Sequence, residues 1–216
     1  MKTNPKIKAY ALIASLVFMI PISINWFTFL ARTISDDNDT PVNPLEYKIL
    51  TDSTAAVSNC LLETDTISIP EKVHIKEIYY TVTKIESKAF SYCRRLTNIE
   101  IPASVTSIGY SAFENCSSLT NIDIPVSVTN IGYSAFKNCS NLTNINIPAS
   151  VTSIEEGTFN GCFQLNNVEI PASVTKIGYS AFAGCSNLNV VINNSKDNVV
   201  IDYHAFLGCR SVRYAE

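Results

Sequence analysis

Residues 101–116 read IPASVTSIGYSAFENC, and this stretch decides the fold because it returns along the chain with a spacing of 23 residues. The other clear copies lie at residues 124–139, 147–162 and 170–185. A diverged copy precedes them, from Val82 through Phe90 to Cys93, and another trails to Cys209. A unit of this length cannot bury its own apolar side chains, whereas stacked neighbours can. The sequence therefore predicts a repeat solenoid.

Each unit contains two extended pieces and a turn. The segment from Leu96 to Ile101 ends with apolar residues at every second position, Ile99 and Ile101. This pattern is typical of a short half-buried strand. Its copies start at Leu119, Leu142 and Leu165. Residues 105–108 form a second extended piece. The spacing of Ala112, Phe113 and Cys116 then predicts a short helical or 3₁₀ turn with one buried side.

The pattern IPxSVTxIGxxAFxxCxxLTxI resembles the BspA-like, or Treponema pallidum-type, leucine-rich repeats of surface proteins from host-associated bacteria and parasitic protists. The resemblance covers about residues 46–216. It implies an α/β repeat solenoid: a curved array of 23-residue units with short parallel strands and short helical or 3₁₀ turns. Residues 82–216 then hold about five full units and a partial last one.

Residues 46–81 resemble the β-hairpin-like N-terminal cap of the same family. Its strands correspond to four apolar pieces: Tyr47-Lys-Ile-Leu, Ala55-Ala-Val, Ile67-Ser-Ile-Pro and Tyr79-Tyr-Thr-Val. The usual Asn-Gly turn of that cap is replaced by His74-Ile-Lys-Glu, which weakens the prediction of a hairpin at this point.

The N-terminal 34 residues predict export. Residues 9–31 carry no charge, three lysines precede them, and Arg32 and three aspartates follow. An apolar span of about 20 residues crosses a bilayer, and the lysines place the preceding end in the cytoplasm. We expect an uncleaved signal anchor; a cleaved signal peptide and a buried helix of the folded domain are the alternatives. Residues 35–45 read as a linker.

Composition excludes several function classes. The chain is 46% hydrophobic and 16% charged, with a net charge of −3, so it is neither a disordered chain nor a basic nucleic-acid binder. His74 and His204 are the only histidines, and no nucleophile elbow, phosphate loop or HExxH motif occurs. We therefore predict no enzyme activity, no metal, no cofactor and no catalytic residue.

The cysteines follow the repeat from Cys93 to Cys209 in steps of 23, 23, 23, 23 and 24 residues. Metal binding favours close pairs such as C-x-x-C, which are absent from the sequence. We interpret the row as a ladder of small buried thiols in one layer of the core. Sporadic disulfides remain an alternative in an exported protein.

Two rows of outward positions are candidate binding surfaces. We call the first the strand stripe, because it alternates with the apolar strand residues: Asn98, Glu100, Asn121, Asp123, Asn144, Asn146, Asn167 and Glu169. The second, the turn row, holds the secondary candidates on the turn side of the coil: Tyr110, Tyr133 and Tyr179, which follow the second extended piece, and Phe163, which follows the cysteine of its unit. Solvation alone explains the stripe equally well, and stacked tyrosines more often pack on each other than bind a partner.

The resemblance implies a non-enzymatic exported protein that mediates protein–protein interaction or adhesion at the cell surface. The partner expected is a host extracellular protein or another cell-surface protein, with membrane contact only through the N-terminal apolar segment. Two alternatives stay open: a structural cell-envelope or self-assembling surface element, and a carbohydrate-binding module.

Overall fold

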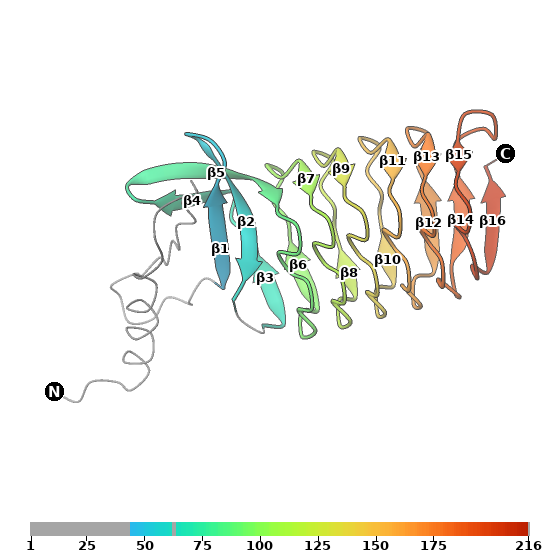
Figure 1. The fold of residues 1–216 in the computed structure, drawn as a ribbon, viewed down its shortest axis with the longest axis horizontal. Helices are drawn as coiled ribbons and strands as arrows, with labels where there is room; N and C mark the ends of the chain where they lie inside the picture. The colour runs from blue at the N-terminus through green and yellow to red at the C-terminus, as the bar shows by residue number, and fades with distance from the viewer. Residues whose placement is uncertain (1–43, 62–63, 216) are drawn as a thin grey trace, which may run out of the picture.

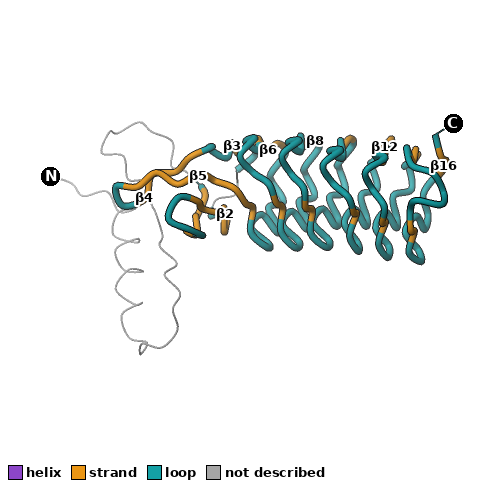
Figure 2. Tube along the Cα trace, turned by 90° about the horizontal axis from the view of Figure 1, so that it is seen from above, coloured by secondary structure: helices purple, strands orange, loops and turns teal. Residues whose placement is uncertain are grey.

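The computed structural model describes residues 44–61 and 64–215 as a β cap followed by a row of stacked coils (Figure 1). Each coil is built from two very short strands joined by loops and turns (Figure 2). Equivalent strands of successive coils pair in parallel, with Asn121 opposite Asn144 and Ile122 opposite Ile145. The predicted solenoid is therefore confirmed. The predicted membrane span at residues 9–31 lies outside the described residues.

The cap joins two antiparallel pairs into one sheet. Strand β1 (Leu45–Ile49) pairs with β2 (Thr54–Cys60), and β4 (Lys72–Ile75) pairs with β5 (Ile78–Ile85). Strands β2 and β5 are parallel neighbours, and β5 also pairs in parallel with the repeat strand at Ser107–Ile108, which joins the cap sheet to the array.

The β4–β5 hairpin forms without an Asn-Gly pair. Lys76 and Glu77 both have positive φ values, 46° and 64°, as a type I′ turn requires of its two central residues. The hairpin that the His74-Ile-Lys-Glu sequence put in doubt therefore does form. The stability comes from the strands, because Val73 and Ile75 are buried in the cap core.

Two columns of strands run along the array. The first column holds β6 (Asn98–Glu100), β8 (Asn121–Ile122), β10 (Asn144–Ile145), β12 (Asn167–Ile170), β14 (Asn189–Ile192) and β16 (Ser211–Tyr214). The second holds β7 (Ser107–Ile108), β9 (Asn130–Ile131), β11 (Ser153–Ile154), β13 (Lys176–Ile177) and β15 (Val200–Ile201).

The third side of each coil is a run of turns. The predicted helical or 3₁₀ turn is wrong: the described residues contain no helix, so the solenoid is all-β and not α/β. In the unit that starts at Ile101, the N–H groups of Ser111, Phe113 and Asn115 donate to carbonyls of the next coil at 2.8–2.9 Å. A helix needs these donors for itself. Positive φ values at Ser111 (50°) and Asn115 (61°) also prevent a right-handed helix.

A stack of phenylalanine rings fills the core behind these turns. Phe90, Phe113, Phe136, Phe159 and Phe182 are fully buried. Successive ring centroids lie 5.1, 5.2, 5.5 and 5.1 Å apart, with nearly parallel planes. Leucine, isoleucine and valine from the two strand columns complete the core around them.

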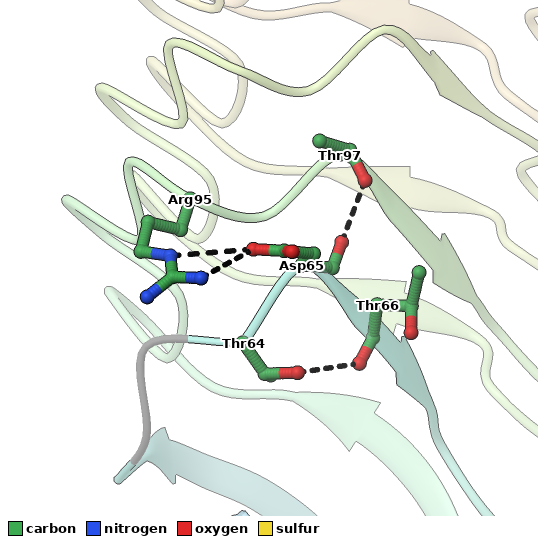
Figure 3. A network of polar contacts seen from close by, with 5 residues as sticks. All are labelled: Thr64, Asp65, Thr66, Arg95 and Thr97. Carbon is green, nitrogen blue, oxygen red and sulfur yellow. Dashed lines mark hydrogen bonds and ion pairs between the residues drawn. The ribbon is translucent and has the colours of Figure 1, made fainter.

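The cap meets the first repeat through β3 (Thr66–Ser68), which pairs in parallel with β6. Figure 3 shows the polar contacts beside this pair. Arg95 donates through Nε and Nη2 to one carboxylate oxygen of Asp65, at 3.2 and 3.1 Å. Thr97 Oγ1 donates to the Asp65 carbonyl at 2.7 Å. The ion pair is mostly exposed and contributes little, so the strand pairing sets the junction.

Burial predicts unequal costs for two neighbouring aromatic residues. Phe136→Ala should lower the free energy of unfolding by about 3–5 kcal/mol, because a buried ring leaves a cavity. Tyr133→Ala should cost within about 1 kcal/mol, because that side chain is 52% exposed. Urea denaturation of the two variants measures both changes. Equal losses would contradict the assignment of inward and outward faces.

Candidate functional site

All eight side chains of the strand stripe are exposed, while the strand residues between them are buried. The alternation follows from the strand geometry, since successive side chains point to opposite faces. Register keeps the stripe in columns: Asn144 lies opposite both Asn121 and Asn167. The stripe is thus an exposed polar row on the first strand column, in register from Asn121 to Asn167.

The stripe continues beyond the residues that the sequence analysis named. Asn167 pairs with Asn189, and Asn189 with Ser211, whose Oγ donates to the Asn189 side chain at 2.8 Å. Glu169 is followed in register by Val191 and then by Arg213. These residues were missed because one residue is deleted before β14, so the 23-residue count fails there. The alternation Leu188, Val190, Ile192 was the available signal.

The chemistry of the stripe is amide and carboxylate. Within the described residues, the ion pairs join Lys84 to Glu86, Arg95 to Asp65 and Lys137 to Glu114, and none includes a stripe carboxylate. The stripe acids Glu100, Asp123 and Glu169 therefore carry their charge into solvent. The row presents hydrogen-bond acceptors and donors on an open surface.

Threonine hydroxyls hold the strands beneath the stripe at a fixed spacing. Thr120 Oγ1 donates to the Thr97 carbonyl at 3.2 Å, and Thr143 Oγ1 donates to the Thr120 carbonyl at 3.0 Å. Each of these threonines also donates its backbone N–H to the same carbonyl. The stripe is therefore carried by a hydrogen-bonded frame and needs little ordering on binding.

The turn row lies on another side of the coil. Tyr110, Tyr133, Phe163 and Tyr179 are between 46% and 52% exposed. Within the part of the chain that the structure describes, no ring contact joins Tyr110 to Tyr133. The exposed aromatic side chains of the central coils belong to this row, and none belongs to the strand stripe.

The thiol ladder is confirmed. Cys116, Cys139, Cys162 and Cys185 are buried, and these four and Cys209 are free thiols. Each Sγ donates to a phenylalanine carbonyl of the preceding coil, as from Cys116 to Phe90 at 3.0 Å and from Cys139 to Phe113 at 3.2 Å. Burial raises the pKa of Cys116 from 9.0 to about 12. The thiols are structural hydrogen-bond donors.

Each of the two histidines packs against a tyrosine ring. His74 lies 4.6 Å from the Tyr79 ring, and His204 lies 3.8 Å from the Tyr203 ring. No group of three or more His, Cys, Asp and Glu side chains able to hold a metal ion occurs among residues 44–61 and 64–215. In the same residues, no helix is long and apolar enough to cross a membrane.

These repeats match a known family. The model described as "BspA type Leucine rich repeat region" matches residues 83–213 in six copies. The chain belongs to the BspA-type leucine-rich repeat family. No curated protein matches it significantly.

Solved structures of BspA-type and related leucine-rich repeat proteins share the fold. A leucine rich cell surface protein from Faecalibacterium prausnitzii is 31% identical with a TM-score of 0.70, over 82% of this chain and 52% of that protein. This chain thus spans about half of that relative. A leucine-rich repeat protein from T. pallidum is 23% identical with a TM-score of 0.57, over 82% of this chain and 85% of that one.

The raised thiol pKa values predict alkali sensitivity. Burial raises the pKa of Cys116 and Cys209 to about 12, and it also raises the pKa of Cys139 and Cys162. The folded state therefore holds these protons more tightly than the unfolded state. Their contribution is complete below the ordinary thiol pKa of 9.0 and is lost as pH rises toward about 12.

Urea denaturation between about pH 7 and pH 10.5 should show stability that falls above about pH 9. The double variant Cys116→Ala and Cys139→Ala removes two of the thiols, so its stability should fall less steeply. The unmodified chain and the double variant differ only at these two thiols, so the difference between their slopes reports the thiols. An equal slope, or rapid alkylation of the folded chain by iodoacetamide near about pH 8, would contradict the assignment.

Proposed function

We propose that this protein is a non-enzymatic, cell-surface member of its family that binds other proteins through the strand stripe and so mediates adhesion. The observation that carries the proposal is the exposed polar row of the strand stripe, which is in register from Asn121 through Asn144 to Asn167. A regular solenoid offers such a partner a long, shallow surface.

A macromolecular partner fits this surface better than a small molecule. The coil interior is filled by the phenylalanine stack and by the apolar residues of both strand columns. Small-molecule sites are concave and mostly apolar, whereas the stripe is open and polar. Uncompensated acids at Glu100, Asp123 and Glu169 also favour a partner with basic groups in its rim.

Location at the cell surface is supported from two sides. The Faecalibacterium relative is described as a leucine rich cell surface protein. In this chain, three lysines precede the uncharged residues 9–31 and aspartates follow, which is the charge pattern of an exported domain. We propose a single-pass anchor at residues 9–31 with the repeats outside.

Protease treatment of intact cells tests this location. Trypsin added outside should remove the repeats at exposed basic residues, because residues 33–216 lie beyond the membrane. A cytosolic marker protein in the same cells should stay intact. Repeats that resist trypsin until the cells are lysed would place them inside and contradict the proposed topology.

A stripe variant tests the binding surface. Replacement of Asn121, Asp123, Asn144 and Asn146 by serine should abolish adhesion to immobilised extracellular matrix proteins. Folding should be retained, because exposed polar changes cost within about 0.5 kcal/mol each. Surface plasmon resonance measures adhesion, and urea denaturation measures folding.

The matched control replaces Tyr110 and Phe163 on the turn row by serine and should leave adhesion intact. Loss of adhesion in this control alone would move the site to the turn row. If both variants adhere like the unmodified chain, the structural cell-envelope role replaces the binding role.

A further inference from the structure

The third clear copy of the repeat, residues 147–162, departs from the others in its turn segment. Residues 155–157 read Glu-Glu-Gly where the other clear copies read Gly-Tyr-Ser, and Gly161 and Phe163 replace Asn and Ser of the first two copies. Two departures have a backbone reason. Gly157 (φ 62°) and Gly161 (φ 75°) stand where Ser134 (54°) and Asn138 (59°) already hold positive φ.

Hydrogen bonds within its own coil account for Glu155. Its side chain is half-buried and accepts a hydrogen bond from Ser153 Oγ. Its carbonyl accepts the Thr158 hydroxyl at 2.8 Å. Glu156 has no such role: it is exposed, and no ion pair among the described residues includes it. Its carboxylate is a departure that the fold does not require.

Glu156 stands between two tyrosines of the turn row. Ser134 N–H donates to the Glu156 carbonyl at 2.9 Å, and Gly157 N–H donates to the Tyr179 carbonyl at 3.0 Å. These bonds set Tyr133, Glu156 and Tyr179 side by side at equivalent positions of three successive coils. Ring centroids of Phe136, Phe159 and Phe182, in the same coils, are spaced 5.5 and 5.1 Å apart. One carboxylate is thus flanked by two half-exposed phenol rings.

We propose that Tyr133, Glu156 and Tyr179 form a docking site for a basic side chain, arginine above all, of a partner protein. The carboxylate neutralises the cation, and the ring faces attract it through their quadrupoles. Arginine suits the site because its planar guanidinium stacks on rings while it hydrogen-bonds a carboxylate. The site lies apart from the strand stripe, so it stands or falls independently of the proposed stripe function.

The same row already holds a cation within the molecule. Lys88 Nζ lies 5.7 Å from the centroid of the Tyr110 ring, over its face. Lys88 occupies the position equivalent to Ser111 in the preceding coil and, like it, has a positive φ of 63°. A tyrosine at this position is therefore accessible to an ammonium group. A neutral glycan could donate hydroxyl hydrogen bonds to the carboxylate but would leave its charge unneutralised.

Titration of the ¹⁵N-labelled full-length chain with N-acetylarginine methylamide tests the site by NMR. Amide shifts should concentrate at Tyr133, Glu156, Gly157 and Tyr179. The citrulline analogue, of similar shape without charge, should produce none of them. Glu156→Gln should weaken binding about fivefold, as for an exposed charge pair, and Tyr179→Leu about two- to fivefold.

Two further variants make the outcome decisive. Glu156→Tyr restores the residue of the other copies, so it should fold normally and bind the arginine probe more weakly. Glu71→Gln, the same carboxylate-to-amide change at an exposed cap residue outside both candidate rows, should leave the shifts and affinity unchanged. Equal weakening by Glu71→Gln, equal shifts with citrulline, or shifts from cellotetraose that Glu156→Gln leaves unaltered would each overturn the proposal.

Discussion

The structure depends on one constraint: every residue of a coil lies over its own copy in the next coil. Backbone bonds such as Phe113 N–H to the Ala135 carbonyl impose it at 2.8 Å. Side chains repeat the bond pattern, because Ser127 Oγ donates to the Val105 carbonyl at 2.6 Å and Cys139 Sγ donates to that of Phe113 at 3.2 Å. A residue type that works once thus works in every unit, which is why the sequence repeats.

The constraint acts unevenly around the coil. Inward positions must fill a layer of fixed thickness, so phenylalanine, cysteine and leucine recur there almost without change. Some glycines are held by close approach, since a Cβ at Gly132 would lie 2.7 Å from the Gly109 carbonyl carbon. Outward positions on the strand stripe and turn row face solvent and carry no such requirement. Functional differences between members of this architecture therefore belong on the outward positions.

The same contrast between inward and outward positions explains which parts of the fold could be predicted from the sequence. Alternation predicted the strands and the outward stripe, and the period predicted the phenylalanine and thiol layers. The turn was mispredicted because Ala112, Phe113 and Cys116 have a spacing that a helical turn and this run of turns share. Only the positive φ of Ser111 and the direction of its N–H separate the two, and neither is visible in residue type. The turn at Lys76 and Glu77 could not be predicted for the same reason, since both residues have the positive φ values that lysine and glutamate seldom adopt.

Departures from a repeat are informative once their backbone cause is known. Gly157 and Gly161 relieve positive φ values that serine and asparagine tolerate elsewhere, so they need no ligand to explain them. Glu156 relieves nothing: it exchanges a half-exposed phenol for a charge that no described residue neutralises. In a fold where each copy repeats the same packing problem, the other copies act as internal controls. A surface residue that differs from the other copies without a packing reason therefore indicates a contact with a partner.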